Sequence, residues 1–185
     1  MWGAQVEVGS FPTSYIKTTG ASATRSADDV SITGENFSSW YRQDEGSIYA
    51  DILPNYAIHY GTAALTIGAA QDSLSFSPGG AGQVRFFIRT NNTSQAVIDQ
   101  TGFTENNLKL SAAYASDYAY FSVNGETIGE DTSVLLPSVD HMHIGQDRFG
   151  SEMCAHIKKI AYYPQRLTNE QLQNLTKQLF EINQQ

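Results

Sequence analysis

The stretch that decides the fold is KKIAYYPQRLTNEQLQNLTKQLF, residues 158–180. It begins as a strand, and Pro164 then removes a backbone donor that a further ladder bond would need. Thr168 and Gln171, three residues apart, form the capping-box pattern that starts a helix. The helix carries one apolar stripe, made of Leu172, Leu175 and Leu179. These features predict a helix over 168–183 that packs its stripe on the body of the domain.

From residue 28 onward, the chain before this helix carries strand signals and nothing that looks helical. Short runs rich in β-branched and aromatic residues alternate with Gly and Pro. Asn124-Gly125 suits the two positive φ angles of a type I′ hairpin turn. Strands are expected at 47–54, 56–61, 64–69, 72–77, 83–90, 108–115, 118–123, 126–129, 133–137, 140–145 and 153–163. The sequence therefore predicts an all-β fold, an antiparallel β-sandwich with a short C-terminal helix.

Composition narrows the function classes. The chain has 185 residues, of which 41% are hydrophobic and 16% charged, so one packed domain is expected rather than disorder. The net charge is −8 and the basic residues are scattered, which argues against a nucleic-acid partner. No apolar stretch is long enough for membrane insertion. The one cysteine, Cys154, excludes an intrachain disulfide and is expected to be a small buried hydrophobe.

Residues 1–27 differ from the rest of the chain. They are rich in Gly, Ser, Thr and Ala and poor in core-forming side chains. We expect an extended segment, a linker from a preceding domain, in front of a sandwich over 28–185. The chain is expected to be the C-terminal part of a longer protein.

Three segments resemble concanavalin A-like, laminin-G-like jelly rolls, and they occur in the order that those domains show. They are YAYFSVNGETIG, HMHIGQDRFG and IKKIAYYPQRLTNEQLQNL, within residues 110–180. The resemblance implies a concanavalin A-like jelly roll. That fold hosts many functions, so it does not by itself imply one.

A second resemblance covers most of residues 2–52. WGAQVEVGSFPTSYIKTTGASATRSAD and ENFSSWYRQDEGSIYADI resemble a joint between β domains of tailed-bacteriophage fibre and other virion proteins. The resemblance implies a non-catalytic, receptor-binding domain of a tail fibre or virion appendage. It would bind a bacterial surface polysaccharide or lipopolysaccharide, as a homotrimer in the virion with other virion proteins. The alternatives are a purely structural head-decoration module without a ligand and, less favoured, a glycan hydrolase.

The hydrolase alternative needs paired carboxylates on one strand face, in a Glu-x-Asp-x-x-Glu arrangement that sets an acid and a nucleophile across one bond. No such cluster is present in the sequence. Asp44 and Glu45 are adjacent, so they point oppositely in an extended chain, and Asp51 stands alone in its strand. No catalytic residue is therefore predicted.

A sugar site combines an aromatic face with planar polar side chains that bind hydroxyl groups. Two loops offer these types, and the predicted glycan-binding residues are Tyr114, Asp117, Tyr118, Gln146, Asp147 and Arg148. For Asp147 and Arg148 the alternative is a salt bridge within the turn. Trp40 is interpreted as an aromatic residue that packs on the core.

His141-x-His143 places two imidazoles on one strand face, and Asp147 follows nearby. Two ligands do not make a metal site, so ordinary strand alternation is the favoured interpretation and no metal ligand is predicted. No cofactor is expected. Bound Ca²⁺ stays open, because several lectins of the resembled fold bind it.

Overall fold

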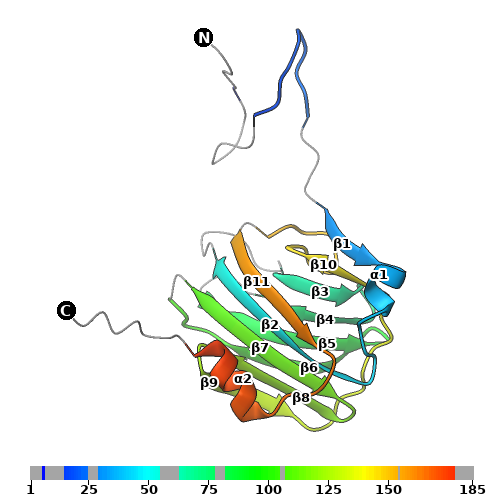
Figure 1. The fold of residues 1–185 in the computed structure, drawn as a ribbon, viewed down its shortest axis with the longest axis vertical. Helices are drawn as coiled ribbons and strands as arrows, with labels where there is room; N and C mark the ends of the chain where they lie inside the picture. The colour runs from blue at the N-terminus through cyan, green and yellow to red at the C-terminus, as the bar shows by residue number, and fades with distance from the viewer. Residues whose placement is uncertain are drawn as a thin grey trace, which may run out of the picture.

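The protein folds as a sandwich of two antiparallel sheets with a helix on one outer side (Figure 1). The computed structural model describes residues 6, 15–24, 29–54, 63–77, 82–104, 107–153 and 155–177. The strands of the six-stranded sheet, in spatial order, are β1 (Val30–Thr33), β10 (His141–Ile144), β3 (Leu65–Gly68), β4 (Ser73–Phe76), β5 (Val84–Thr90) and β6 (Thr93–Gln100). Those of the five-stranded sheet are β11 (Ala155–Tyr163), β2 (Glu45–Pro54), β7 (Leu108–Ala115), β8 (Tyr118–Val123) and β9 (Glu126–Asp131).

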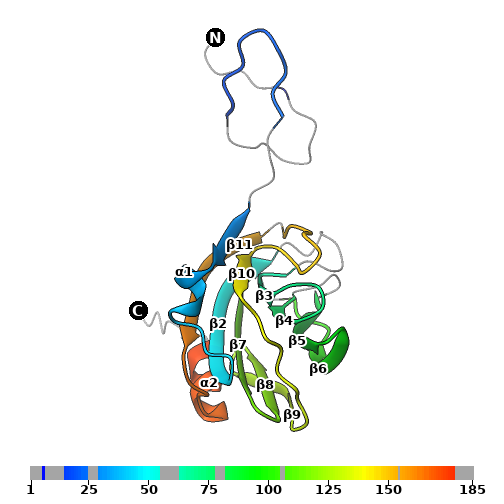
Figure 2. The ribbon, with the colours of Figure 1, turned by 90° about the vertical axis from the view of Figure 1, so that its right-hand side faces the viewer.

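Figure 2 shows the two sheets edge-on, with their inner sides facing each other. Every strand pair is antiparallel. The prediction of an all-β antiparallel sandwich is therefore confirmed. The division of the chain at residue 28 stays a prediction.

The core lies between the sheets, where alternate residues of each strand point inward. Phe76 and Phe86 of the six-stranded sheet meet Phe121 of the other sheet, with ring centroids 5.7 and 6.1 Å apart. All three side chains are at most 1% exposed. Aromatic side chains of this size dominate the energetics of a core, so they hold the two sheets together.

Most of the expected strands form, but two were missed. β6 was not predicted, because only Ala96 and Ile98 of its eight residues are buried, and the other side chains of this edge strand are polar except for the exposed Val97. β1, a four-residue edge strand, was missed as well. The statement that nothing before the C-terminal helix is helical was wrong for α1 (Glu35–Ser38), a single turn.

The strand expected at 133–137 was also wrong. This segment crosses the end of the sandwich without pairing in a sheet, and its backbone bonds to a turn amide and to side chains of β5 and β6. The Asp117 amide donates to the Val134 carbonyl at 3.1 Å, and the Thr90 hydroxyl donates to the Leu135 carbonyl at 2.6 Å. The strand expected at 56–61 and the side chain of Cys154 lie outside the described residues.

The predicted hairpin turn is confirmed. Asn124 and Gly125 have φ angles of 50° and 89°, which is the positive-φ pair that a type I′ turn requires. They join β8 to β9, which pair along the edge of the five-stranded sheet.

The C-terminal helix α2 (Asn169–Thr176) begins where it was predicted. The Thr168 hydroxyl accepts from the Gln171 amide at 3.2 Å, and the Gln171 side chain accepts from the Thr168 amide at 2.9 Å, so both halves of the capping box are present. The predicted end at residue 183 was wrong, because Lys177 leaves the helix with ψ of 130°. The Thr176 hydroxyl instead bonds to the Gly125 amide at 3.0 Å, which ties the last helical turn to the β8–β9 hairpin.

Neither helix among the described residues has the length and apolar character needed to cross a bilayer.

Candidate functional site

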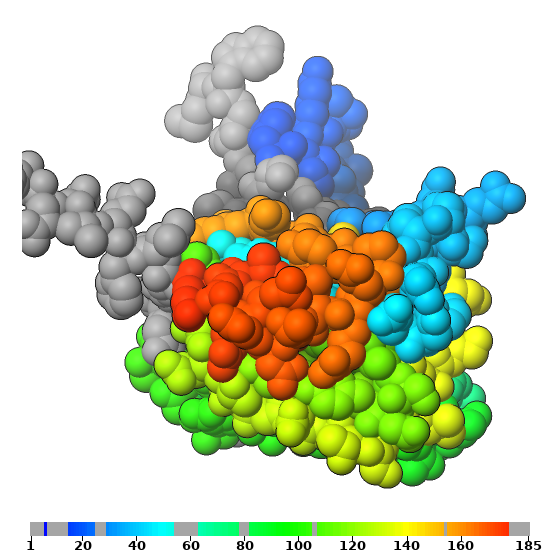
Figure 3. Space-filling view, turned by 60° about the horizontal axis from the view of Figure 1, so that its bottom comes forward, coloured from blue at the N-terminus to red at the C-terminus, as the bar shows by residue number. Residues whose placement is uncertain are grey.

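Helix α2 covers much of the outer side of the five-stranded sheet (Figure 3). Leu172 packs there with Ala113 of β7 and Tyr120 of β8, and each of these side chains is at most 1% exposed. The Ser111 hydroxyl donates to the Leu172 carbonyl at 3.0 Å and fastens the helix to the sheet. The predicted packing of the helix on the sandwich is confirmed, and no helix among the described residues lies on the outer side of the six-stranded sheet (Figure 2).

We call the outer side of that sheet the six-stranded face. Its position follows from alternation along β5: Phe86 and Ile88 belong to the core, so Arg85, Phe87 and Arg89 point outward. Strand register places Phe87 in a row across the face with Ser31, His143, Thr66, Ser75 and Val97. Thr66, Ser75 and Phe87 in this row are at most 7% exposed, so the accessible polar groups beside Phe87 are the half-buried arginines Arg85 and Arg89.

The β10–β11 loop contacts the six-stranded face through Thr66, whose hydroxyl donates to the Gln146 carbonyl at 2.9 Å. Within the loop, one oxygen of Asp147 accepts from the amides of Phe149 and Ser151, each at 2.8 Å. No ion pair joins Asp147 to Arg148 among the residues that the structure describes, so the alternative of a turn salt bridge is not seen there. Asp147 is 8% exposed and shapes the loop rather than offering its carboxylate to a ligand.

The loop places Arg148 over the face. The centre of its guanidinium lies 4.7 Å from the ring centroid of Phe87 and 4.7 Å from that of Phe149. Both distances are in the cation–π range. Phe149 itself is 70% exposed. An exposed aromatic ring, a guanidinium and a second ring therefore lie next to one another.

Unpaired buried polar atoms concentrate on this face. Five side-chain atoms in the described part of the chain are buried without a hydrogen-bond partner. Four of them belong to the six-stranded face or its loop: Ser73 Oγ, Arg89 Nε, His143 Nδ1 and Arg148 Nε. The fifth, Asp51 Oδ1, is on the other sheet. Buried polar groups in folded proteins are nearly always satisfied, and His143 Nδ1 lies 3.7 Å from an Asp29 carboxylate oxygen, so the other atoms mark places where a bound water would complete the bonding.

Of the arginines on the six-stranded face, only some are paired with a carboxylate. Arg85 pairs with Asp99 of β6 at 2.9 Å. Arg89 donates to the amide oxygen of Asn92, which is neutral. Burial lowers the pKa of Arg148, and the positive charge of Arg89 adds to that effect. An arginine keeps its charge regardless, so Arg89 and Arg148 leave positive charge on the face.

The other predicted residues lie at the opposite end of the sandwich. Strand β2 defines the two ends: Ala115 pairs with Glu45 at its start, whereas Ala155, just after the β10–β11 loop, pairs with Pro54 at its end. The structure therefore does not bring the two predicted loops together.

Tyr114 was wrongly predicted as a sugar-stacking residue. Its side chain is 1% exposed, and its hydroxyl donates to the Arg42 carbonyl at 2.7 Å. Asp117 occupies the β7–β8 turn with φ of 56°. The ring of Tyr118 lies 3.9 Å from the Arg166 guanidinium, and its hydroxyl is 2.9 Å from the Asn169 side chain. These contacts give the turn a role in holding the start of α2.

The interpretation of Trp40 as a packing residue is confirmed. Its ring contacts Phe37 and Tyr162 at centroid distances of 5.2 and 4.9 Å, and it packs against the core. The imidazoles of His141 and His143 share the six-stranded face at 5.0 Å, as strand alternation requires. Within the described residues, no group of three or more His, Cys, Asp or Glu side chains could hold a metal ion.

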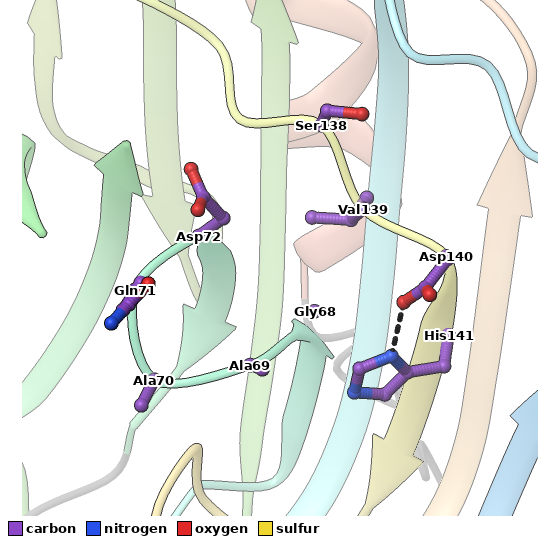
Figure 4. Close-up of a pocket in the computed structure, with 9 residues that line it drawn as sticks. All are labelled: Gly68, Ala69, Ala70, Gln71, Asp72, Ser138, Val139, Asp140 and His141. Carbon is purple, nitrogen blue, oxygen red and sulfur yellow. Dashed lines mark hydrogen bonds and ion pairs between the residues drawn. The ribbon is translucent and has the colours of Figure 1, made fainter. Parts of the chain in front are cut away.

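A hollow of about 430 Å³ lies at the end of the sheet between the β3–β4 turn and the segment before β10 (Figure 4). Asp140 and His141 face each other on its rim at 2.5 Å. Gly68 closes its base with φ of 91°, where an added Cβ would lie 2.2 Å from the Asp72 carbonyl oxygen. Of the other side chains that line it, Asp72 accepts from the Asn91 amide at 2.9 Å.

Solved structures share the β-sandwich fold. The carbohydrate-binding module CBM40 of the Ruminococcus gnavus IT-sialidase, bound to α2,3-sialyllactose, matches with a TM-score of 0.65 and 13% identity, over 82% of this chain and 97% of that one. The chain is a concanavalin A-like jelly roll. Domain 4 of AbnA, an arabinanase from Geobacillus stearothermophilus in complex with arabinotriose, matches this jelly roll with a TM-score of 0.60 and 14% identity, over 72% and 67% of the two chains.

A pentraxin from Limulus polyphemus also matches the jelly roll, with a TM-score of 0.56 and 14% identity, over 72% of this chain and 70% of that one. At such identities the likeness shows the fold alone. No protein-family model and no curated protein sequence matches the chain.

Arg148 was predicted as a site residue, but its neighbours on the six-stranded face, Phe87 and Arg89, were not. Phe87 and Arg89 lie in the run QVRFFIRT, which was interpreted only as a strong strand. The signal was present as Arg-x-Phe-x-Arg at 85, 87 and 89, because a period of two puts these three side chains on one face.

Proposed function

We propose that this chain is a non-catalytic carbohydrate-binding domain that binds glycans on the six-stranded face. The cluster of Arg148 with the rings of Phe87 and Phe149 carries the proposal. Sugar hydroxyls accept hydrogen bonds, so they suit the set of guanidinium donors on Arg89 and Arg148. The C–H face of a sugar ring suits the exposed ring of Phe149, which is 70% exposed beside this set.

The structural neighbours support a carbohydrate ligand. Two of them are named as complexes with sugars, sialyllactose in one case and arabinotriose in the other. One is named as the carbohydrate-binding module of a sialidase and the other as domain 4 of an arabinanase. A binding role without catalysis is consistent with such neighbours.

The carboxylates of the six-stranded face support a non-catalytic role. Glycoside hydrolysis needs one carboxyl group as an acid and a second as a base or nucleophile. Asp99 is held by Arg85 at 2.9 Å, and Asp147 is held by two loop amides at 2.8 Å. Neither carboxylate is placed to serve in such a pair.

The sequence resemblance of residues 2–52 supports a tailed-phage fibre or another virion appendage as the setting. In that setting the domain attaches a virion to a bacterial surface polysaccharide or lipopolysaccharide, as a homotrimer. Mass photometry of the purified chain tests the trimer, and labelling of bacterial cells tests the attachment.

Glycan binding is tested on an array of bacterial polysaccharides with the wild-type chain, Phe149→Ala and Leu135→Ala. Phe149 and Leu135 are 70% and 59% exposed, so both substitutions leave the core intact. Leu135 bonds to Thr90, at the far end of β5 from the β10–β11 loop, and is the matched control. We expect Phe149→Ala to weaken binding about tenfold, since fully burying a phenylalanine side chain contributes roughly 1.5–3 kcal/mol. A folded wild-type chain that binds no glycan and no cell would favour the structural module.

A further inference from the structure

The net charge of the chain is −8, yet its six-stranded face carries three arginines. Arg85 and Arg89 point outward on either side of Phe87, and Arg148 reaches Phe87 from the β10–β11 loop. Like charges that gather on one face repel each other. A positive patch on an acidic protein is therefore a feature that needs a partner.

The three arginines differ in what balances them. Arg85 is neutralised by Asp99 at 2.9 Å. Arg89 contacts only the neutral amide of Asn92 among the hydrogen-bond partners that the structure describes. The carboxylate nearest in sequence to Arg148 is that of Asp147, and it accepts from the amides of its own loop. The charges of Arg89 and Arg148 are thus left without a carboxylate contact in the described part of the chain.

Both arginines also have an unused donor. The Nε of Arg89 and the Nε of Arg148 are buried without a hydrogen-bond partner. Ser73, which pairs with Arg89 across β4 and β5, has an unpaired hydroxyl as well. An arginine fork donates two parallel hydrogen bonds to the two oxygens of a carboxylate, and these charge-assisted bonds are the strong ones.

We propose that the six-stranded face recognises an acidic sugar, with Arg89 and Arg148 as the residues that bind its carboxylate. The inference rests on the proposed glycan-binding function and names its substrate class. The rings of Phe87 and Phe149 flank Arg148 at 4.7 Å each and hold its guanidinium in place, so little side-chain freedom is lost on binding.

A sulfate or phosphate on a glycan presents related anionic oxygens, so the test must separate these sources. The wild-type chain is applied to an array that holds neutral, carboxylated, sulfated and phosphorylated bacterial polysaccharides. Each carboxylated glycan that binds is measured again by biolayer interferometry after chemical reduction of its carboxyl groups to alcohols. The same measurements are made at low and high NaCl concentration.

Arg148→Gln and Arg89→Gln test the two residues, and Arg166→Gln is the matched control. Arg166 has the same charge, is exposed, and lies over Tyr118 at the other end of the sandwich. We expect each test variant to weaken binding to the carboxylated glycan roughly tenfold or more, because charge-assisted hydrogen bonds to a carboxylate are the strong ones. Arg166→Gln should change it less than twofold. Reduction of the carboxyl groups should weaken wild-type binding by the same factor and remove the effect of both substitutions.

The outcomes separate the inference from the function on which it rests. Binding that survives carboxyl reduction, or that is restricted to neutral glycans, overturns the acidic-sugar inference and leaves glycan binding intact. Binding to sulfated or phosphorylated glycans alone overturns the carboxylate as the ligand. A chain that is folded by circular dichroism and binds none of the array overturns the proposed function itself.

Discussion

Leu172→Ala tests whether α2 is part of the folded domain or only attached to it. Leu172 is 0% exposed and packs with Leu167, Ala113 and Tyr120 in a cluster separate from the main core. Truncation removes buried methyl groups and leaves a cavity, which costs about 2–5 kcal/mol at such sites. The Ser111 bond to the Leu172 carbonyl involves the backbone and survives the change.

Urea unfolding followed by fluorescence measures the effect. With a loss of roughly 3 kcal/mol and a denaturant slope of about 2 kcal/mol/M, the midpoint should fall by about 1.5 M. Leu135→Ala is the control, since that side chain is 59% exposed and its loss should change stability by less than about 0.5 kcal/mol. Glycan affinity should stay unchanged in Leu172→Ala, because α2 lies on the outer side of the other sheet. A midpoint equal to that of the control would refute the view that the helix stabilises the sandwich.

Two further predictions follow from the same structure. Thr168→Ala removes the hydroxyl that accepts from the Gln171 amide at 3.2 Å, so it should lower the free energy of unfolding in urea by about 1 kcal/mol. Thr168→Ser keeps a hydroxyl and should retain most of that stability. Equal urea midpoints for the Ala and Ser variants would contradict the capping box. Burial raises the pKa of Tyr49 to about 12 and raises the pKa values of Tyr41 and Tyr114 from the ordinary 10.0. The folded state therefore favours neutral tyrosine, so this stability is present below pH ~10, the unfolded value, and is lost as the pH rises above it. Thermal melts between pH 8 and 12 should show a falling midpoint from pH ~10, and a constant midpoint would contradict the burial of these hydroxyls.

The parts of the fold that could be predicted are those that local chemistry dictates. The Thr168–Gln171 capping box and the Asn124-Gly125 turn each depend on a few neighbouring residues, and both formed as expected. The end of α2 could not be predicted in this way. It depends on the Thr176 hydroxyl meeting the Gly125 amide at 3.0 Å, and that contact exists only when the hairpin and the helix are both in place.

Edge strands were missed for a related reason. In β6 only Ala96 and Ile98 are buried, so its pattern is close to that of a polar loop. What makes it a strand is the neighbouring β5, which offers a row of backbone groups for it to pair with. The opposite error occurred at 133–137, where apolar residues suggested a strand. The Val134 carbonyl instead accepts from the Asp117 amide in a turn, and the Leu135 carbonyl accepts from the Thr90 hydroxyl of β5.

The candidate site also depends on contacts between distant parts of the chain, which local sequence patterns do not reveal. Composition identified aromatic and planar polar residues in two loops, and it could not say that Tyr114 points into the core while Arg148 reaches across to Phe87. The missing information is which side of each strand faces outward and which side the helix covers. Once α2 is placed on the five-stranded sheet, the alternation of β5 assigns Arg85, Phe87 and Arg89 to the six-stranded face. The acidic-sugar hypothesis then depends on arginines 59 positions apart in the sequence, Arg89 and Arg148, which no local pattern connects.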